Sequence, residues 1–593
     1  MRAADYVFKK LAQIGISRAY LVTGRGALFL TDALAKNKEI TPICTHHEQS
    51  AGYAAAAESQ LTGNPSLCLV STGCASTNCV TAVLNAWQDN LPVIFISGQH
   101  VLNETTYFTG HKLRTYGQQE ANIISIVESI TKYSRMVTCV EELPKIIDEA
   151  ISSAITGRKG PVWIDIPLDI QSSRLSEQLI KKHKPINLRK KKFNPNNIKK
   201  LESDLKLASR PVILIGSGVR HSNTILDLKK FIETNNVPLV YSASSVDIYP
   251  SGNKLSIGSI GSMGCSREGA FALQNSDLVI ILGNRMPSIL TGLDFCKFAR
   301  DAKVHVVDID KFEHQKSGIK IDNFINIDLS EFFALLSKRK ITKKIDPWIK
   351  TVLNWKKFFN NYQNFEKSNK LDLYDLSRLL SKKLNKDAVV ITDSGFIEVI
   401  LPTNINFSPS RRAIHPISQG SMGFALPAIL GVHNLNKERQ ILCVVGDGSI
   451  MMNLQELQTI SHHKIKAKII IINNDIYSII RRRQKELFRN RTIGTGILDG
   501  VSVPNFKKVA SSFNFEYFSC NNTKNLEQQL DQFLQNPRAA ILELKGRLDQ
   551  KYVEIGYTKN KKGKIVRRPL EDQWPYLDRE FFLKEMIVEP IDQ

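Results

Sequence analysis

Two polar side chains in the last third of this 593-residue chain each follow a short apolar run, and their oxygen atoms could hold a metal ion. Asp447 stands between two glycines after the run at 441–445, and Asn474 follows the run at 469–472. Carboxylate and amide oxygens suit Mg²⁺, which takes further ligands from a bound diphosphate and water. Glycines let the backbone come close to the phosphates. Gly-Asp-Gly alone usually marks a turn and Asn-Asn usually ends a strand, so their combination is what indicates a magnesium–diphosphate site.

The elements that must position these side chains are short apolar runs, rich in β-branched residues, which alternate with helical patterns along the whole chain. Runs of this kind suit a parallel sheet that is covered on both faces. Because open α/β sheets bind ligands at the carboxyl ends of their strands, Asp447 and Asn474 would emerge at a binding edge. The predicted strands are 67–70, 93–96, 162–164, 212–215, 278–282, 304–307, 388–391, 441–445 and 469–472.

Two charged stretches divide the chain into three blocks of similar size. The first, near 175–200, is rich in lysine and arginine, contains two prolines and is typical of a solvated linker. The second, near 338–370, is charged and poor in glycine. The predicted fold class is therefore α/β with three domains, and the first and third blocks could be distant structural relatives.

The composition, 42% hydrophobic and 23% charged, is that of an ordinary globular protein and excludes a disordered, collagen-like or disulfide-stapled chain. No apolar run approaches the roughly 18 residues that span a bilayer, so no membrane insertion is expected. Residues 1–14 lack the apolar core of a secretory signal and predict an amphipathic helix with Val7, Leu11 and Ile14 on one face. A cytoplasmic protein is the expectation.

Nine cysteines without a C-x-x-C pair indicate neither a zinc site nor disulfides. The net charge of +23 invites a nucleic-acid interpretation, but much of it is concentrated in the predicted linker and at 559–568. Neither basic run has the interleaved aromatic residues of a single-strand binding surface, so no nucleic-acid partner is expected. Codon bias and small anionic substrates are the alternative explanations of the charge.

Gly-Asp-Gly, the 24 residues from Ser449 to Ile472, and then Asn-Asn together resemble the metal–diphosphate signature of thiamine diphosphate enzymes. Residues 45–56 resemble the His-Glu-Gln-x-Ala-Gly-x-Ala segment of the acetolactate synthase group. The C-terminal segment 568–577 resembles the tail of the branch associated with surface-polysaccharide pathways. Further similar segments, which extend the resemblance to about residue 545, are 71–78, 92–99, 119–120 and 420–427.

This resemblance implies three doubly wound parallel-sheet domains, in which the thiamine diphosphate-binding fold occurs twice and flanks a Rossmann-like central domain. The pyrimidine-binding domain would cover 1–175, the central domain 190–340 and the diphosphate-binding domain 365–550, followed by a tail at 551–593. In the family, the catalytic glutamate and the diphosphate site come from different subunits. A homodimer or homotetramer with shared active sites is therefore implied.

The resemblance also implies thiamine diphosphate and Mg²⁺ as cofactors. Asp447, Asn474 and the backbone carbonyl of Ile476 would hold the metal, and the side chain of Met422 would bend the coenzyme by lying between its two rings. The implied cofactor-binding residues are Gly24, Arg25, Glu48, Thr72, Asn78, Ser421, Met422, Gly446, Asp447, Gly448, Ser449, Asn474, Ile476 and Tyr477.

Glu48 and Gln119 are the implied catalytic residues. Glu48 would form a charge-assisted hydrogen bond with the pyrimidine ring of the coenzyme and so help to shift one proton. Because Thr45-x-x-Glu48 before an alanine-rich run is also a capping-box sequence, a helix cap is the competing interpretation of this glutamate.

The implied reaction is decarboxylation of a 2-keto acid, pyruvate, with transfer of the two-carbon unit to an acceptor carbonyl. Ile479 and Ile480 align with apolar residues at the family's active-site entrance, and Arg483 stands where acetolactate synthases carry a tryptophan. A fixed cation in place of an apolar ring favours an anionic acceptor. The implied substrate residues are Arg25, Gln118, Gln119, Ile479, Ile480 and Arg483.

A nucleotide-activated keto-sugar is therefore the predicted acceptor. Acetolactate synthesis from two pyruvates is the alternative, and a non-catalytic relative of the fold that acts as a binding protein is the third interpretation. FAD binding is a further family trait. Whether this chain binds FAD stays open, because residues 261–265 fit the family's flavin region whereas 284–288 depart from its acidic segment.

Overall fold

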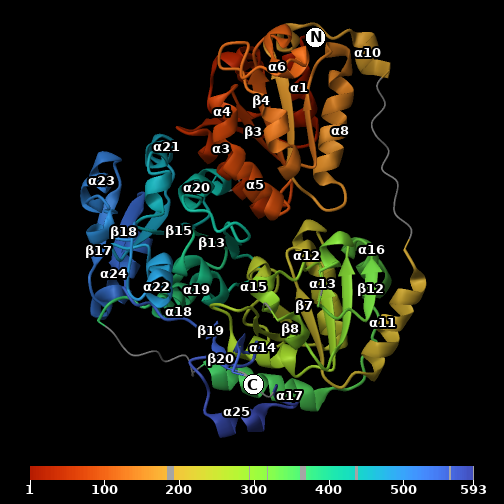
Figure 1. The fold of residues 1–593 in the computed structure, drawn as a ribbon, viewed down its shortest axis with the longest axis vertical. Helices are drawn as coiled ribbons and strands as arrows, with labels where there is room; N and C mark the ends of the chain where they lie inside the picture. The colour runs from red at the N-terminus through yellow and green to blue at the C-terminus, as the bar shows by residue number, and fades with distance from the viewer. Residues whose placement is uncertain are drawn as a thin grey trace.

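The computed structural model describes residues 1–182, 193–292, 294–316, 318–360, 369–433, 438–559 and 563–591. The described residues form three parallel six-stranded sheets, each covered by helices (Figure 1). This arrangement confirms the predicted α/β class with three doubly wound domains. Part of the predicted linker, residues 183–192, lies outside the described residues. No described helix is both long and apolar enough to cross a membrane.

The first sheet has the strand order β2-β1-β3-β4-β6-β5. Its interior strands β3 and β4 are buried along their whole length, because their side chains alternate between two helix-covered faces. The strands are β1 (Arg18–Leu21), β2 (Thr41–Cys44), β3 (Ser66–Val70), β4 (Val93–Gln99), β5 (Tyr133–Met136) and β6 (Val162–Pro167). The helices are α1 (Ala3–Gln13), α2 (Leu28–Lys36), α3 (Glu48–Thr62), α4 (Cys74–Asn78), α5 (Val80–Gln88), α6 (Thr106–Thr109), α7 (Ile123–Val127), α8 (Leu143–Ile155), α9 (Leu168–Ser172) and α10 (Glu177–Lys182).

The central sheet has the order β12-β11-β10-β7-β8-β9, so the direction of winding reverses between β10 and β7. Ligands of open α/β sheets bind at such a switch point. The strands are β7 (Pro211–Ile215), β8 (Leu239–Tyr241), β9 (Ser256–Ser259), β10 (Leu278–Leu282), β11 (Lys303–Asp308) and β12 (Asn323–Asn326). The helices are α11 (Pro195–Leu207), α12 (Gly218–His221), α13 (Ile225–Asn235), α14 (Arg267–Gln274), α15 (Ser288–Thr291), α16 (Leu329–Leu336) and α17 (Asp346–Asn360).

The third sheet, β14-β13-β15-β16-β18-β17, repeats the order of the first sheet strand for strand. The strands are β13 (Val389–Thr392), β14 (Arg412–Ile414), β15 (Ile441–Gly446), β16 (Lys468–Asn473), β17 (Glu516–Cys520) and β18 (Ala540–Lys545). The helices are α18 (Leu373–Lys383), α19 (Phe396–Asn404), α20 (Ala425–His433), α21 (Glu456–His462), α22 (Ser478–Leu487), α23 (Phe506–Ser512) and α24 (Leu526–Gln535).

The C-terminal tail packs mainly on the central domain. Its helix α25 lies beside α17 (Figure 1), where the rings of Phe581 and Phe358 stack with centroids 4.5 Å apart. The tail elements are β19 (Glu554–Ile555), β20 (Tyr557–Lys559), β21 (Ile565–Arg567), β22 (Gln573–Trp574) and α25 (Arg579–Glu585).

Small residues bring the first and third domains together where α3 packs on α20. A Cβ atom at Gly431 would lie 2.2 Å from the carbonyl oxygen of Ala54, so only glycine allows the two helices to come this close. At the same interface, the buried guanidinium of Arg18 contacts the carboxylate of Glu58 at 2.5 Å.

The two charged stretches contain more regular structure than a solvated linker would. Helix α11 begins at Pro195, inside the first stretch. The second stretch forms α17, whose Trp348, Trp355 and Phe359 are buried in the central core. The amphipathic helix predicted for residues 1–14 is confirmed as α1, which buries Val7 and Leu11.

Candidate active site

The carboxylate of Asp447 is held by backbone amides at the edge of the third sheet. Strands β15 and β16 are parallel neighbours, so Asp447 and Asn474 leave the sheet at the same edge. One carboxylate oxygen accepts from the amides of Asn474 at 3.0 Å and Asp475 at 2.6 Å, and the other accepts from that of Gly448 at 2.8 Å. Burial raises the pKa of Asp447 to about 6, although these hydrogen bonds lower it. A cation beside the carboxylate would favour its charged form.

The other predicted metal ligands lie in the turn that follows. The side-chain amide of Asn474 donates to Ser478 Oγ at 2.6 Å, and its oxygen accepts from the amide of Ile476 at 3.3 Å. A Cβ atom at Gly448 would lie 2.0 Å from the ring of Tyr477, so glycine is needed for this ring to close over the turn. One buried carboxylate, one amide and nearby backbone carbonyls form an oxygen donor set that fits Mg²⁺ together with a diphosphate.

Asp393 ties the Met422 segment to this turn, and the sequence analysis missed it. It is fully buried just after β13. One of its oxygens accepts from Ser449 Oγ at 2.5 Å and from the amide of Gly423 at 3.2 Å, and the other accepts from the amide of Ala425 at 2.9 Å. The signal that could have found it is Thr-Asp-Ser-Gly directly after a predicted strand, the same strand-end position that Asp447 occupies.

Glu48 opens helix α3 without capping it. The N-cap residue is His47, whose Nδ1 accepts from the amide of Gln49 at 3.1 Å. The hydroxyl of Thr45 donates to the carbonyl of His47 at 2.9 Å, so the predicted capping box does not form. The half-buried carboxylate of Glu48 instead accepts from Asn78 Nδ2 at 2.9 Å. This geometry removes the helix-cap interpretation of Glu48.

The start of α3 contacts the segment that carries Met422. Ser50 Oγ donates to Asn453 Oδ1 at 3.0 Å, and Asn453 Nδ2 donates to the carbonyl of Gly423 at 2.8 Å and to Gln49 Oε1 at 3.1 Å. Asn453 therefore joins two of the segments on which the cofactor prediction depends, one from the first domain and one from the third.

The loops after β1 and β3 place further predicted residues at the same edge of the first sheet as Glu48. A Cβ atom at Gly24 would lie 2.5 Å from Ser71 Cβ, so these two loops are in close contact. Thr72 Oγ1 donates to Gln99 Oε1 at 2.5 Å, which fixes the loop after β3 against the end of β4. The carboxyl ends of these strands thus gather the predicted residues of the first domain.

Models of three thiamine pyrophosphate enzyme domains match this chain. The N-terminal TPP binding domain matches residues 1–127, the central domain 198–334 and the C-terminal TPP binding domain 393–544. The acetolactate synthase large subunit of Buchnera aphidicola subsp. Acyrthosiphon pisum is 30% identical over 539 residues, which cover 89% of this chain and 91% of that one. The chain belongs to the acetolactate synthase large-subunit family of thiamine diphosphate enzymes.

Two other relatives have similar coverage. The acetolactate synthase isozyme 1 large subunit of Escherichia coli (strain K12) is 29% identical over 546 residues, which cover 91% of this chain and 93% of the relative. The large subunit of Lactococcus lactis subsp. lactis (strain IL1403) is 27% identical over 535 residues, 89% of each chain. The family resemblance seen in the sequence is thus confirmed. This acetolactate synthase-like enzyme is a carboligase whose cofactors are thiamine diphosphate and a divalent metal.

Gln119, the second predicted catalytic residue of this acetolactate synthase-like enzyme, lies in a turn with strained backbone. Its φ is +63°, and a Cβ atom at Gly73 would lie 2.1 Å from its carbonyl oxygen. A left-handed conformation at a residue other than glycine costs on the order of 1 kcal/mol, and such strain gathers at functional sites. The preceding Gln118 accepts from Arg25 Nη1 at 2.7 Å, and both side chains are exposed.

Helix α22 follows the metal turn and carries the predicted acceptor residues of the third domain. Ile480 is 54% exposed, whereas Ile479 is partly buried in the core. The side chain of Arg483 is 41% exposed and contacts Glu486 of the same helix at 3.0 Å. Arg481 pairs with Asp499 and Arg482 with Glu554, both outside the helix, and Arg482 also contacts Glu486 at 2.7 Å.

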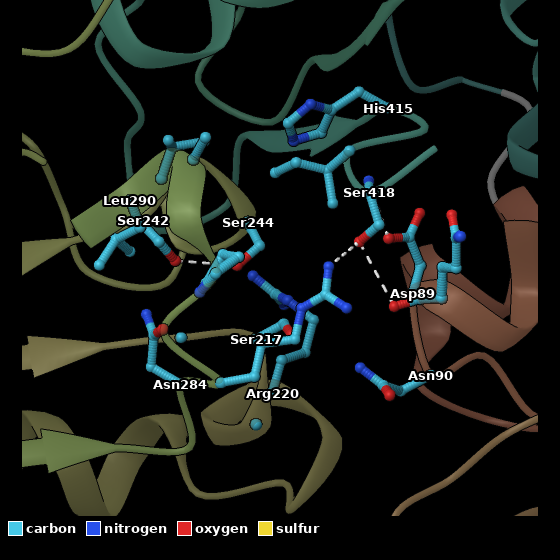
Figure 2. Close-up of a pocket in the computed structure, with 18 of the residues that line it drawn as sticks. Asp89, Asn90, Ser217, Arg220, Ser242, Ser244, Asn284, Leu290, His415 and Ser418 are labelled. Atoms are coloured by element: carbon cyan, nitrogen blue, oxygen red, sulfur yellow. Dashed lines mark hydrogen bonds between the residues drawn. The ribbon is translucent and has the colours of Figure 1, made fainter. Parts of the chain in front are cut away.

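A cavity of about 620 Å³ lies between the three domains of the enzyme, with residues of each in its wall (Figure 2). Gly216 and Gly283 follow β7 and β10 at the switch point, and a Cβ atom at Gly216 would lie 2.4 Å from the carbonyl oxygen of Gly283. Crevices at such switch points bind dinucleotides. Neither Glu48 nor Asp447 lines this cavity, so it is distinct from the predicted metal site.

The polar wall of this cavity fits a dinucleotide such as FAD. Arg285 donates to Ser418 Oγ at 2.7 Å, and the amide of Ser418 donates to the carboxylate of Asp89 at 3.1 Å, so all three domains meet there (Figure 2). Nδ1 of His415 is buried without a hydrogen-bond partner among the described residues. Burial raises the pKa of Asp89 to about 6 and lowers that of His415 to about 4. The segments 261–265 and 284–288 both contribute to the wall, including the one that departs from the family pattern.

Proposed function

We propose that this enzyme decarboxylates pyruvate and transfers the two-carbon unit to the carbonyl of an anionic acceptor, a nucleotide-activated keto-sugar. When bound, thiamine diphosphate supplies the nucleophilic carbon and takes up the electron pair left by CO₂. Asp447, Asn474 and the carbonyl of Ile476 would hold its metal. Glu48 would bond the pyrimidine ring and hold the proton that the reaction moves there.

The proposal of an anionic acceptor rests on the ion-pair contacts of Arg483. Within the described part of the chain, Glu486 on the same helix is its one ion-pair partner. Arg481 is held instead by Asp499, and Arg482 by Glu554 as well as by Glu486, which it shares with Arg483. A guanidinium that no other element holds is available to a phosphate or carboxylate of the substrate, with which it forms strong charge-assisted hydrogen bonds.

Acetolactate synthesis from two pyruvates is the second candidate. It is favoured by the relatives, which are named acetolactate synthases and share 27% to 30% of their residues with this chain. Pyruvate is itself an anion, so Arg483 is compatible with this acceptor as well.

Isotope-labelled pyruvate separates the two candidates. The holoenzyme is incubated with labelled pyruvate and a panel of nucleotide-activated keto-sugars, and products are identified by mass spectrometry. A sugar that gains a labelled two-carbon unit supports the proposed acceptor, whereas acetolactate as the sole product refutes it. Arg483→Gln should lower kcat/KM for the acceptor about tenfold, as expected for loss of a charge-assisted bond. Lys485→Gln, an exposed site on the same helix, is the matched control.

We also infer a homodimer or homotetramer in which two subunits share each active site. Apolar side chains that are exposed in the single chain support such an interface, and a second copy would cover them. In the first domain they are Leu28, Tyr107, Phe108, Leu113 and Tyr116, and in the third Met451, Met452, Leu487, Ile497 and Leu498.

Complementation between two inactive variants tests the sharing. Glu48→Gln and Asp447→Asn are each inactive if both residues serve the site. Unfolding and refolding a mixture should restore about a quarter of the wild-type activity, because half of the dimers are mixed and each of these has one intact shared site. No recovery, with dimers present by size-exclusion chromatography, would place both residues of a site on one subunit.

We infer further that the central cavity binds FAD. Its position at the switch point, its glycine-lined floor and its unpaired polar atoms support a dinucleotide. Flavin absorbance of the purified enzyme, and its recovery when FAD is added to stripped protein, test this. Arg285→Gln should weaken flavin retention. A colourless enzyme that takes up no FAD would contradict the inference.

A further inference from the structure

One short segment of the C-terminal tail, which contains β19, connects the central domain to the acceptor side of the site. Residues 552–555 lie beyond the segment that the family's C-terminal domain matches. The amide of Gly264 donates to the carbonyl of Val553 at 2.7 Å, and the amide of Ile555 donates to that of Ser262 at 3.0 Å. The tail thus adds an antiparallel strand to a loop of the central domain, and its position is fixed by backbone hydrogen bonds.

Two side chains of this segment, Tyr552 and Glu554, hold Arg482 of α22. The carboxylate of Glu554 accepts from the guanidinium of Arg482, and the guanidinium carbon lies 5.1 Å from the centroid of the Tyr552 ring. Tyr552 is buried and packs on Phe396, with ring centroids 5.4 Å apart. The side chain of Glu554 is 14% exposed. Because a sheltered ion pair is screened less than an exposed one, this contact fixes Arg482 firmly.

The contact constrains the orientation of α22. Arg481 is held on another side of the helix by Asp499, at 2.8 Å. Successive residues of an α-helix point about 100° apart, so holding two adjacent side chains fixes the rotation of the helix about its axis. That rotation decides where Ile480 and Arg483 point.

We propose that Glu554 and Tyr552 are positioning residues for the acceptor: they hold Arg482 and thereby direct Arg483 and Ile480 toward it. The inference rests on the proposed carboligase function and adds the tail to its acceptor site. Among the described residues, neither tail side chain contacts the predicted metal turn or Glu48. The first half of the reaction, loss of CO₂ from pyruvate, is therefore expected to proceed without the tail contact.

Glu554→Gln tests this, because it removes the charge and keeps the size of the side chain. In a single turnover of the holoenzyme, the rate of CO₂ release from pyruvate should stay within about twofold of wild type, while kcat/KM for the acceptor falls about fivefold to tenfold. Arg482→Gln should have at least this effect, because it removes the pair with Glu554 and also the pair with Glu486 at 2.7 Å. The double variant should be no worse than Arg482→Gln alone, because both lack the Arg482–Glu554 pair.

Tyr552→Leu removes the ring beside the guanidinium and should lower kcat/KM for the acceptor in the same way, with CO₂ release in a single turnover close to wild type. Glu580→Gln, exposed in helix α25 of the same tail, is the charge-matched control. Equal losses of CO₂ release and acceptor transfer in Glu554→Gln would show a merely structural tail and overturn the proposal, as would an unchanged acceptor kcat/KM.

Both the keto-sugar and pyruvate are tested as the acceptor in these assays. Failure of the keto-sugar prediction can therefore be distinguished from failure of the proposed carboligase function. A wild-type enzyme that makes only acetolactate refutes the keto-sugar acceptor, and the tail contact is then measured with pyruvate. A wild-type enzyme that releases no CO₂ from pyruvate refutes the proposed function and this inference with it.

Discussion

Replacing Asp393 by asparagine should weaken thiamine diphosphate binding, although Asp393 lies behind the predicted cofactor residues. One of its carboxylate oxygens accepts from Ser449 Oγ at 2.5 Å and from the amides of Ser394 at 2.7 Å and Gly423 at 3.2 Å, and the other accepts from the amide of Ala425 at 2.9 Å. Asparagine has a single acceptor oxygen, and its NH₂ group would face a backbone amide that also needs an acceptor. If the oxygen of the asparagine takes the position that accepts three hydrogen bonds, its NH₂ group faces the amide of Ala425. That amide then has no acceptor.

The expected loss follows from these contacts. A hydrogen bond to a charged group contributes about 1.5–3 kcal/mol, so losing one and weakening the rest costs about 3 kcal/mol. If this cost falls on the segment that carries Met422, the coenzyme dissociation constant rises roughly 150-fold. Titration with thiamine diphosphate at fixed Mg²⁺, followed by intrinsic fluorescence, measures it. Asp387→Asn, an exposed site in the same domain, is the control. A variant that is less stable to urea but binds the coenzyme normally would refute the reasoning.

Glu48→Gln should reduce CO₂ release from pyruvate by about 10²–10⁴-fold while coenzyme binding stays measurable, and unchanged turnover would remove Glu48 from the mechanism. Gly431→Val should lower the free energy of unfolding by about 1–3 kcal/mol in urea titrations, because even a Cβ atom would lie 2.2 Å from the carbonyl oxygen of Ala54; an unchanged midpoint would contradict the close helix contact. Burial raises the pKa of Asp89 to about 6, so the stability linked to its protonation is fully present below the unfolded pKa of about 4 and is lost as the pH rises through 6. Relative to wild type, Asp89→Asn should therefore gain up to about 3 kcal/mol between pH 4 and pH 7.5 in unfolding titrations, and a shift of opposite sign would contradict this.

The sequence predicts interior strands better than edge strands. The run at 278–282 coincides with β10, which is buried along its whole length between two neighbours. Strand β5 was missed; it lies at the edge of the first sheet, and only one of its four residues is buried. An edge strand needs no continuous apolar run, because one side of it has no neighbouring strand. β8 was missed for a different reason, since three residues are too few to show a pattern.

The parts of the site that the sequence predicts are those that local order determines. Because Asp447 and Asn474 follow neighbouring parallel strands, their shared edge could be inferred from position alone. The contacts of Asp393 and Asn453 depend on segments far away in the chain, so no local pattern predicted them. The capping box at Thr45 fits the sequence, yet the imidazole of His47 takes the capping role because the helix begins at Glu48. A pattern of side chains does not determine at which residue a helix starts.

The repeated strand order explains why the two parts of the proposed site belong to two domains. Glu48 follows β2 in the first sheet, and the Met422 segment follows β14, which holds the same place in the third. The helices after these two strands, α3 and α20, pack against each other, and their small residues bring them into close contact. Each copy of the fold thus offers equivalent loops at its carboxyl edge, but one carries a carboxylate and the other a metal turn. Since neither copy has both, an active site needs one copy of each kind, and we infer that these two copies come from different subunits. The α3–α20 contact within one chain would then fix how its two domains are placed for pairing with those of the other subunit.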